Sequence, residues 1–416
     1  MLVPKLKFKR EDGTDYPDWK SKQLHSIFIE RNETQTITEN APLLSFTIEQ
    51  GVINPEEKKT NKRDFLIKDK DNKKYALTEY NDIIYNPANL KFGAIHRNKL
   101  GRGVVSPIYA IFQTDENPVF MEYIVTNPVF IKKSLKYLEG TVIKLMSLKP
   151  RDFLLMKCCI PCIEEQEKIA DFLSTVDEVI AQSEAEAKNL EQQKKAAMQK
   201  IFSQEVRFKH EDGTDYPEWE EKPFVSFCDV ITKQTGFDYT KTIKRALLTE
   251  QKDGTLPYLQ TKNFTGINFD YSTDYYIPIE VANQFERIIL DRKCLLFSIV
   301  GASVGNIALF PNTVKCFLSG AICVAKPIKE EWAAYLYHFM CSELGQSQIR
   351  NATKGSGQAT ITIEDIRAFS IKTPCLEEQQ KIADFLSAYD EAISYAKQEL
   401  DKWKELKKGL LQQMFV

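Results

Sequence analysis

Two stretches of this chain are nearly identical, and they constrain its fold more than any other feature. PCIEEQEKIADFLS begins at Pro161, PCLEEQQKIADFLS begins at Pro374, and the two agree at 12 of 14 positions. Looser similarity continues downstream, where Asp177-Glu178 corresponds to Asp390-Glu391 at the same separation of 213 residues. A period this long does not suit a solenoid and indicates a chain of two similar halves.

Each copy is predicted to begin a long helix. A proline stops the preceding segment, and two glutamates follow at a place where the helix dipole favours negative charge. Apolar residues then recur in alternating steps of four and three, which is the spacing of a coiled-coil seam. The second seam is Ile382, Leu386, Tyr389, Ile393, Ala396, Leu400, Trp403, Leu410 and Met414. The first keeps this register with weaker members, namely Ile169, Leu173, Val176, Ile180, Ser183, Ala187, Leu190, Ala197 and Ile201.

The predicted helices are too long to be stable alone. Neither Gly nor Pro interrupts residues 165–202, and such a helix would be a rod of about 57 Å. We expect the two helices to pair antiparallel, because the second globular region joins the end of one helix to the start of the other. This predicts a globular region at each end of a two-helix coiled coil, with a pseudo-twofold axis. The alternative is that each helix packs separately on its own globular half.

A second repeat precedes each globular region. LKFKREDGTDYPDW, from Leu6 to Trp19, returns as VRFKHEDGTDYPEW, from Val206 to Trp219, at an offset of 200 residues. The Asp-Gly pair indicates a turn, and the Tyr-Pro pair breaks any helix. We expect both tryptophans to anchor this turn on the long helices, a structural role that we favour over a ligand contact.

The regions between the repeats, about 20–160 and 220–373, resemble each other little in sequence. Both alternate short apolar runs with turns, and the runs at 82–85, 104–112, 294–300 and 321–325 are typical of strands. Helical stretches are expected near 118–135 and 330–350. The predicted fold class is α+β, with mixed α/β globular regions. The predicted domains are 1–160, 161–205 for the first helix, 206–373, and 374–416 for the second helix.

Composition limits the function classes. The chain has 43% hydrophobic and 27% charged residues and a net charge of −2, which argues against a diffuse polybasic nucleic-acid binder but allows a local basic groove. No apolar run approaches the length of a membrane span, and the N-terminal stretch lacks the apolar core of a signal peptide. Nine cysteines, an odd number unevenly spaced, fit reduced thiols in a cytoplasm.

Several catalytic sites are absent from the sequence. Gly301 to Gly305 lacks the Gly-Lys-Ser/Thr ending of a Walker loop, and no Gly-rich dinucleotide loop follows a strand. Asn86 to Asn89 is a weak match to an amino-methyltransferase loop without its aromatic residue. Cys158, Cys159 and Cys162 are clustered but have no second pair or histidine nearby, so buried thiols are favoured over a metal site. We therefore expect no catalytic residue, no metal site and no bound cofactor.

Polar loops rich in Lys, Arg, Asn and Gln suit nucleic acid, because cations bind phosphates and guanine edges while amides suit adenine. A solvated surface is the ordinary alternative for each one. The candidates in the first region are Lys58, Lys59, Lys62, Arg63, Lys91, Arg97, Asn98, Lys99 and Arg102. Those in the second are Lys244, Arg245, Gln260, Lys262, Asn263, Arg350, Lys354, Ser356, Gln358 and Thr360.

The whole chain resembles the DNA-specificity subunits of type I restriction–modification systems. The resemblance rests on the two helix starts, the twin EDGTDYP segments, and IKTPCLEEQ after GSGQATITIEDI. GRGVVSPIYAIF in the first region, and YLQTKNF and LLFSIVGASVGNIALF in the second, are similar to target-recognition segments of that family. The first region departs from the pattern at EGTVIKLMSLKPRDF, which puts in doubt any contact role for Glu139 to Lys144.

The resemblance implies a non-catalytic subunit whose two target-recognition domains each read one half of a bipartite site on double-stranded DNA. The helices would set the gap between the halves, at most about 17 base pairs for a rod of about 57 Å. Two modification subunits would dock on the repeats and methylate adenine with S-adenosylmethionine. Motor-nuclease restriction subunits would add cleavage driven by ATP and Mg²⁺.

The repeated helix starts are the predicted partner-binding surfaces. Their candidate residues are Glu165, Lys168, Phe172, Glu378, Lys381 and Phe385. For the two phenylalanines, packing against the adjacent globular region is an equal alternative. Two other functions stay open: a coiled-coil scaffold that joins two protein partners without reading DNA, and an enzyme with its own methyltransferase centre. The scaffold predicts no salt-dependent DNA binding, and the enzyme predicts that the isolated chain binds S-adenosylmethionine.

Overall fold

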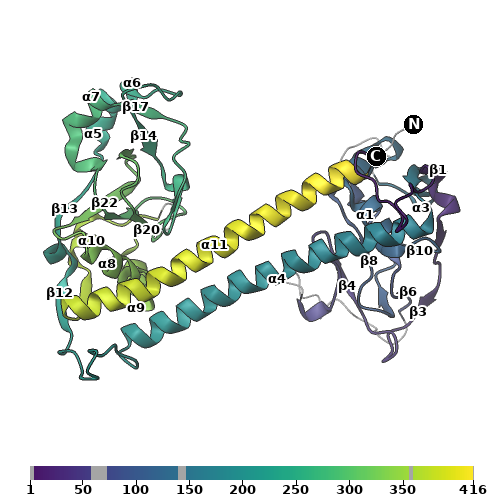
Figure 1. Ribbon diagram of the computed structural model, residues 1–416, viewed down its shortest axis with the longest axis horizontal. Helices are drawn as coiled ribbons and strands as arrows, with labels where there is room; N and C mark the ends of the chain where they lie inside the picture. The colour runs from purple at the N-terminus through teal and green to yellow at the C-terminus, as the bar shows by residue number, and fades with distance from the viewer. Residues whose placement is uncertain (1–3, 58–72, 139–146, 356–358, 416) are drawn as a thin grey trace. The chain divides into compact units, whose positions relative to one another are not determined.

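The computed structural model describes residues 4–57, 73–138, 147–355 and 359–415. The chain separates into two compact units: unit 1 is Met1–Gln182 with Asp401–Val416, and unit 2 is Ser183–Leu400. One boundary falls inside α4 (Ile163–Phe202) and the other inside α11 (Leu376–Met414), so each unit contains one segment of each long helix. Figure 1 labels the two helices.

The repeated stretches do begin long helices. Helix α4 spans Ile163–Phe202 and helix α11 spans Leu376–Met414, both within the predicted bounds. Glutamates occupy the first turn of each. Gly409 lies within α11 without ending it.

Unit 1 is built on a four-stranded antiparallel sheet of order β2-β10-β7-β8. These strands are β2 (Phe28–Glu30), β10 (Ala110–Thr114), β7 (Ile83–Tyr85) and β8 (Ile95–Arg97). A separate pair, β1 (Lys20–Gln23) with β11 (Lys157–Ile160), joins the start of the globular region to its end, just before α4. Short 3₁₀ turns η1 (Leu24–Ser26), η2 (Pro55–Glu57), η4 (Leu90–Phe92) and η5 (Leu135–Tyr137) connect these elements.

Three short helices pack in the core of unit 1. They are α1 (Pro118–Thr126), α2 (Pro128–Ser134) and α3 (Pro150–Leu155). Asn117 and Asn127 cap α1 and α2 by accepting backbone N–H bonds, which ends one helix and starts the next within the predicted stretch 118–135. Buried aromatic residues of β2, β10, α1 and α3 form the centre of this core.

Residues inserted between β2 and β10 add a second layer to unit 1. The sheet β3-β6-β9 consists of Thr34–Gln35, Tyr75–Thr78 and Gly103–Val105, and β4 (Ser45–Thr47) pairs with β5 (Gly51–Ile53). The sequence predicts one apolar run over 104–112. The structure instead has β9 and β10 in different sheets, because Ser106 to Tyr109 form a turn closed by the Tyr109 N–H to the Ser106 carbonyl.

Unit 2 repeats the central design in a different sequence. Its antiparallel sheet has the order β13-β22-β19-β20, with strands Cys228–Lys233, Ile322–Pro327, Cys294–Ser298 and Ile307–Phe310. In chain order this is first, fourth, second, third, as in unit 1. A pair made of β12 (Glu220–Pro223) and β23 (Ser370–Thr373) again joins the start of the region to its end, and η7 (Phe224–Phe227) follows β12.

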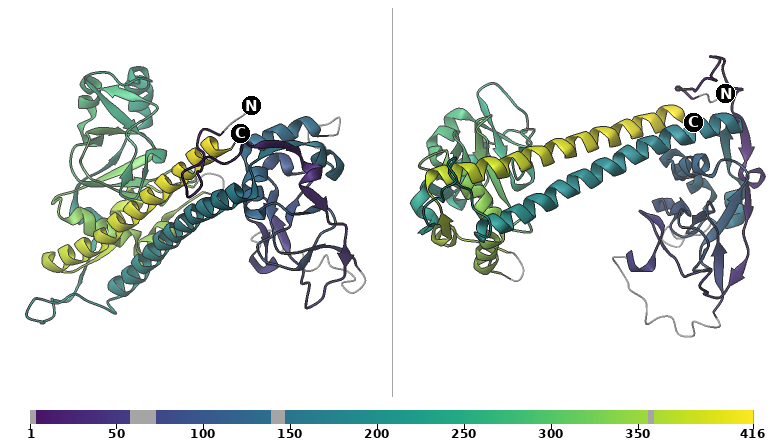
Figure 2. Two further views of the ribbon diagram at one scale, coloured as in Figure 1. Left: turned by 45° about the vertical axis from the view of Figure 1, so that its right-hand side comes forward. Right: turned by 60° about the horizontal axis from the view of Figure 1, so that its bottom comes forward.

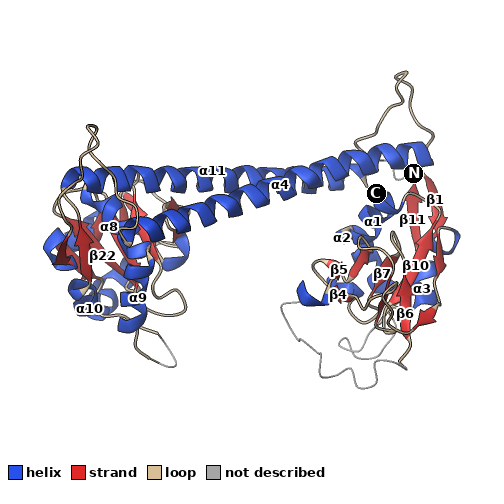
Figure 3. Cartoon of the chain, turned by 90° about the horizontal axis from the view of Figure 1, so that it is seen from below, coloured by secondary structure: helices blue, strands red, loops and turns tan. Residues whose placement is uncertain are grey.

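The helices of unit 2 also correspond in order to those of unit 1. Figure 3 shows α8 (Trp332–Cys341), α9 (Glu343–Ala352) and α10 (Ile363–Ala368) beside the strands of this unit. Ser342 ends α8 and caps α9 by accepting the Gly345 N–H, so the predicted stretch 330–350 is two helices. Helix α8 packs on the central sheet through buried residues such as Tyr335 and Phe339.

The additions to unit 2 differ from those of unit 1. A mixed sheet has the order β17-β14-β21-β18, with strands Tyr276–Pro278, Thr255–Leu259, Cys316–Leu318 and Ile289–Leu290. A hairpin joins β15 (Phe264–Thr265) to β16 (Asn268–Phe269). Short helical turns complete it: α5 (Gly236–Asp238), the π-helical turn η8 (Tyr239–Ile243), α6 (Lys244–Ala246), η9 (Thr261–Asn263), α7 (Ile279–Ala282) and η10 (Asn283–Ile288). The two units thus share a central fold and differ in what is inserted into it.

The two long helices run antiparallel within each unit. In unit 2 the end of α4, including Met198 and Phe202, shares one apolar core with the start of α11, including Ile382 and Leu386. In unit 1 the start of α4, with Leu173, shares a core with Met414 and other residues at the end of α11. Each globular core therefore buries segments of both helices, unlike the alternative in which each helix packs on its own half.

Both ends of the described chain lie in unit 1, where Figure 2 shows the N and C labels close together. The Lys5 and Leu6 N–H groups donate to the Gln413 carbonyl at 2.8 and 3.1 Å. Among the described residues, no helix is long and apolar enough to cross a membrane.

Candidate nucleic-acid interface

The second copy of the EDGTDYP segment is fastened to the start of α11 by a buried carboxylate. Glu378 is fully buried, and it accepts from Trp219 Nε1 at 3.0 Å. Arg207 adds a two-pronged contact, from Nε at 3.2 Å and from Nη2 at 2.8 Å. A charged, bidentate pair of this kind is both strong and directional. The predicted anchoring role of Trp219 is confirmed.

The first copy of the segment is fastened to the start of α4 in the same way, but its glutamate, Glu165, has one partner fewer than Glu378. Trp19 Nε1 donates to Glu165 Oε2 at 3.2 Å, so its predicted anchoring role is confirmed too. Lys7 occupies the place of Arg207 in this repeat, but its side chain pairs with Asp18 at 3.6 Å. Burial raises the pKa of the Glu165 carboxyl, and the Trp19 hydrogen bond offsets only part of that effect.

The remaining partner-binding candidates also touch the repeated segments. Lys168 Nζ donates to the Lys9 carbonyl at 3.3 Å, and Lys381 Nζ donates to the Lys209 carbonyl at 2.8 Å. Phe172 meets Phe8 edge-on at 5.6 Å between ring centroids, and Phe385 meets Phe208 at 5.8 Å. Phe172 and Phe385 nevertheless stay 37% and 40% exposed, which leaves part of each ring for a partner.

Equivalent ion pairs join the two long helices in each unit. In unit 2, Lys194 of α4 pairs with Asp390 of α11 at 2.5 Å, and the lysine lies 5.8 Å from the centre of the Tyr337 ring. In unit 1, Lys407 of α11 pairs with Asp177 of α4 and lies 5.5 Å from the Tyr123 ring. The repeat therefore places the same chemistry at both positions.

The pair in unit 2 carries a buried histidine that unit 1 lacks. His338 is fully buried; its Nε2 lies 3.1 Å from Ser387 Oγ, and its Nδ1 lies 3.7 Å from Asp390 Oδ2. Burial holds the pKa of His338 well below its ordinary value, and the charge of Lys194 acts in the same direction. Burial also raises the pKa of Asp390, against the effect of Lys194. In this environment the imidazole is neutral at neutral pH.

Two candidates in the first region have internal roles. Arg97 is only 10% exposed at its side chain and pairs with Glu122 at 3.1 Å. Asn98 is fully buried, and its amide nitrogen donates to Thr78 Oγ1, the Glu79 carbonyl and the Gly101 carbonyl. These contacts hold the loop between β8 and β9, and neither side chain is offered to a ligand.

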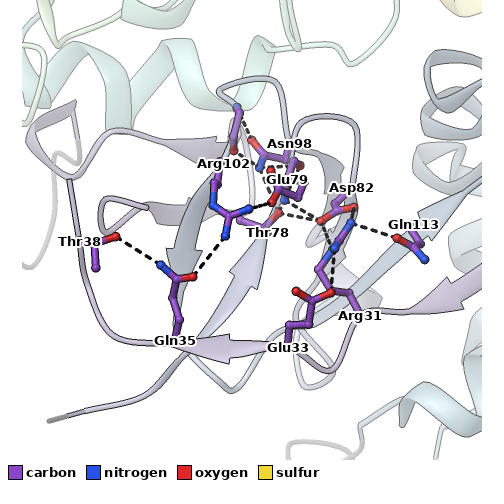
Figure 4. Close-up of polar contacts among 11 residues, drawn as sticks. Arg31, Glu33, Gln35, Thr38, Thr78, Glu79, Asp82, Asn98, Arg102 and Gln113 are labelled. Carbon is purple, nitrogen blue, oxygen red and sulfur yellow. Dashed lines mark hydrogen bonds and ion pairs between the residues drawn. The ribbon is translucent and has the colours of Figure 1, made fainter. Parts of the chain in front are cut away.

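Three other candidates of the first region lie at the surface. Lys99 is 61% exposed and pairs with Glu122, Arg102 is 48% exposed and pairs with Glu79, and Lys91 lies over the ring of Phe92. Figure 4 shows Arg102 in a polar network that runs through Glu79 and Asp82 to Arg31. Arg31 contacts Asp82 at 2.8 Å and exposed Gln113 at 3.1 Å, and neither Arg31 nor Gln113 is among the candidates predicted from the sequence.

The candidates of the second region divide in the same way. Lys244 and Arg245 belong to α6, at the surface of the unit. Asn263 is 4% exposed, and its side chain accepts the Gln260 N–H at 2.9 Å, so it stabilises a turn rather than facing a ligand. Lys262 is exposed and pairs with Asp274. Gln260 and Lys244 line one cavity of about 720 Å³.

The loop after α9 is described only in part. Arg350 pairs with Glu343, Lys354 pairs with Asp365 at 3.4 Å, and Thr360 bonds through its backbone to Lys354. Ser356 and Gln358, together with Lys58, Lys59, Lys62, Arg63 and Glu139 to Lys144, lie outside the described residues.

In the described part of the chain, no group of His, Cys, Asp and Glu could hold a metal ion. All nine cysteines are free, and burial raises the pKa of Cys158 and of Cys323 to about 12, so these thiols are protonated at neutral pH.

Comparison with known proteins points to one family. The family model for the "type I restriction modification DNA specificity domain" matches residues 217–404. The putative MjaX type I restriction enzyme specificity subunit of Methanocaldococcus jannaschii is 24% identical over 97% of this chain and 94% of its own length. The MjaVIII specificity subunit of the same organism is 22% identical over 62% of this chain and 60% of its own length.

Solved structures agree in fold. The type I restriction–modification S subunit from M. genitalium superposes with a TM-score of 0.63 over 100% of this chain and 99% of that chain, at 14% identity. A chain from a structural study of the assembly and conformational transition of the type I restriction–modification system has a TM-score of 0.51 over 96% and 98%, at 15% identity.

Proposed function

We propose that this chain, which belongs to the DNA-specificity subunits of type I restriction–modification systems, recognises a bipartite DNA site. The site would be asymmetric, and each of the two globular regions would read one half of it. Such a subunit is non-catalytic and recognises a DNA sequence. The methyl transfer and the cleavage then belong to partner subunits. The chain would act in the cytoplasm, where it has access to the chromosome.

The observation that carries this proposal is that the two units share a frame, made of the helix starts, the tryptophan–glutamate anchors and the central sheet, and differ in the elements inserted into it. The helix starts, the tryptophan–glutamate anchors and the strand order of the central sheets are equivalent in the two units. The inserted elements differ: unit 1 adds β3-β6-β9 and β4-β5, whereas unit 2 adds β17-β14-β21-β18 and a hairpin. Two globular regions that share a frame but carry different inserted elements are suited to recognise two half-sites of different sequence.

We propose that the surface cations of these two regions contact the DNA. In unit 1 they are Lys91, Lys99 and Arg102, and in unit 2 they are Lys244, Arg245, Lys262, Arg350 and Lys354. Two of them, Arg102 and Arg350, are paired with carboxylates at the surface, and such pairs are weak enough to exchange for phosphate. Arg97, Asn98 and Asn263 are left out of this set because their side chains are used inside the protein.

The long helices would hold the two readers apart. The antiparallel course of the helix segments within each unit supports one antiparallel two-helix coiled coil, with a target-recognition domain at each end and a pseudo-twofold axis. Along straight B-DNA a rod of about 57 Å spans at most about 17 base pairs, which bounds the gap between half-sites.

Two equivalent frame surfaces also predict two equivalent partners. We propose that two modification subunits dock at the starts of α4 and α11, where the half-exposed Phe172 and Phe385 lie. These partners would supply S-adenosylmethionine, and restriction subunits would add ATP- and Mg²⁺-dependent translocation and cleavage. This chain needs no cofactor of its own in that scheme.

Methylation mapping tests the proposal. DNA is sequenced from cells that express the chain with its modification partner, and from cells whose chain lacks residues 20–160. The proposal expects an adenine motif in two unlike parts that disappears with the deletion. If an active partner methylates the same motif without this chain, the specificity function is refuted and a protein scaffold becomes the better account.

A further inference from the structure

The cavity of unit 2 that contains two of the predicted candidates has an unusual lining. Its residues come from the end of β13 and the following turn, the α5–η8–α6 segment, β14 with the turn after it, Tyr275 just before β17, and the turn between β21 and β22. All of these segments belong to unit 2. The cavity measures about 720 Å³, enough for a nucleotide-sized molecule.

Two buried polar side chains in this lining have an atom with no partner among the described residues. Gln234 is 5% exposed and its Nε2 is unpaired; Ser319 is 8% exposed and its Oγ is unpaired. Buried polar groups are usually hydrogen-bonded, and each exception calls for an explanation. The Gln234 amide nitrogen can only donate, so a ligand that satisfies it must present an acceptor, whereas the Ser319 hydroxyl can donate or accept.

The orientation of Gln234 is set by its neighbours. Tyr258, which is 4% exposed, donates from its hydroxyl to Gln234 Oε1 at 3.1 Å. Gly320 passes so close that a Cβ there would lie 3.3 Å from the same oxygen. With Oε1 held in this way, the amide nitrogen of Gln234 is the group left for a ligand.

The walls and rim of the cavity favour a flat anion. Tyr239, Tyr258 and Tyr275 supply aromatic surface, and Lys233 and Lys244 supply positive charge. No Asp or Glu occurs among the described residues that line it. Aromatic side chains bind the faces of nucleobases without strong sequence preference, and lysines bind phosphate.

An unpaired buried side-chain amide nitrogen occurs only at Gln234 among the residues that the structure describes. In unit 1, Arg31, which follows β2, is instead joined to Asp82 at 2.8 Å within the network of Figure 4.

We propose that this cavity binds the base of an unpaired nucleotide, with its edge on Gln234 and Ser319, its face on the tyrosines and its phosphate at Lys244. The nucleotide could be free in solution or turned out of bound DNA; in the second form the inference rests on the proposed function and deepens it. An unpaired base is required because a stacked base within a duplex cannot enter a cavity.

The first arm of the test uses free nucleotides. The full chain is titrated with dAMP, dGMP, dCMP and dTMP, and binding is followed by ligand-observed NMR. Saturable binding is expected for at least one of them. Q234A and Q234E should each weaken it about tenfold, the effect of one lost hydrogen bond. K244A should weaken binding of the nucleotide but not of the matching nucleoside. Exposed Gln251 gives the control Q251A, which should bind like the wild type.

The second arm uses DNA. The full chain with its modification partner is bound to its motif, and 2-aminopurine replaces each adenine in turn outside the methylated position. A base in the cavity should give a fluorescence increase at one position that Q234A abolishes while DNA affinity changes less than about threefold. If only the first arm is positive, the ligand is a free nucleotide.

Negative results in both arms overturn the inference, and so does nucleotide binding that Q234A and Q234E leave unchanged. If both arms are negative but the chain still directs methylation of a two-part motif, nucleotide binding in the cavity is refuted and the proposed function stands. If the chain binds nucleotides but directs no methylation, the proposed function is refuted and nucleotide binding stands.

Discussion

One substitution made at both copies of the tryptophan–glutamate anchor should destabilise unit 2 and should not destabilise unit 1. In unit 2, E378Q removes the charge that accepts two bonds from Arg207 and leaves the guanidinium, 18% exposed, without its main partner. In unit 1, E165Q removes a buried charge that no arginine contacts, while the carboxamide oxygen can still accept from Trp19. The anchors therefore look alike in sequence but differ in their electrostatics.

The size of each effect follows from the contacts. A charged hydrogen bond contributes about 1.5–3 kcal/mol, so E378Q should lower the unfolding free energy of unit 2 by about 2 kcal/mol. For E165Q the folded state should be unchanged or more stable at pH 7. Because burial raises the pKa of Glu165, its ionised form is disfavoured in the folded state. Glu165 therefore contributes stability below its unfolded pKa of about 4.3 and loses it as pH rises through the folded pKa, so the gain from E165Q vanishes at low pH.

The assay must separate the units. Hydrogen exchange of the full chain in increasing urea, followed in peptides of residues 206–219 and 6–19, reports each anchor by itself. Q251A serves as the control because it replaces an exposed glutamine. Equal destabilisation of the two segments by the two variants would refute the electrostatic distinction, and so would a loss of stability from E165Q that grows with pH.

Three further predictions concern particular residues. H338Q should abolish an acid destabilisation of unit 2 between pH 7 and 5. Burial lowers the pKa of His338, so in this pH range only the unfolded chain binds the proton. The measurement is the urea midpoint of unfolding as a function of pH, and a midpoint that depends on pH as in the wild type contradicts the prediction. G409A should stabilise unit 1 by about 0.5–1 kcal/mol, because the glycine lies inside α11 and a Cβ added there would meet nothing within 4 Å; an unchanged or lower Tm contradicts it. G345A should destabilise unit 2 by about 2–3 kcal/mol, because its Cβ would lie 2.4 Å from the Met340 Cα; a stability equal to that of the wild type contradicts it.

The long helices and their anchors could be predicted because local signals specify them. The alternating steps of four and three, the glutamates of the first turn and the absence of proline all lie within the repeated stretches themselves. The observed α4 and α11 fall within the predicted ranges. The tryptophans followed from the repeat as well, since two copies of one segment beside two copies of one helix suggest a shared contact.

The common strand order of the two units could not be predicted. It depends on pairing between strands far apart in the chain, such as β2 with β10 and β13 with β22, and the sequences of these strands differ. Short apolar runs do not show which sheet they join, which is why the sequence alone does not divide the stretch from 104 to 112 into two strands.

The candidate DNA contacts were the least predictable part. Residue type does not tell whether a polar group will find its partner in the protein or in a ligand. Asn98 and Asn263 suit adenine chemically, yet their amides bond to neighbouring loops. Gln234 and Ser319 carried no signal at all, because an unpaired buried atom exists only once the surrounding segments have come together.

A chain carrying one reader twice gives the most direct test of the central claim, that two unlike modules on an equivalent frame read two halves of one site. Residues 220–373 are replaced by residues 20–160, and DNA methylation is mapped in cells that contain the modification partner. In the proposed antiparallel coiled coil the two copies would face opposite directions, so the account predicts a motif of two identical halves arranged as an inverted repeat. A motif that keeps the original second half would contradict the account.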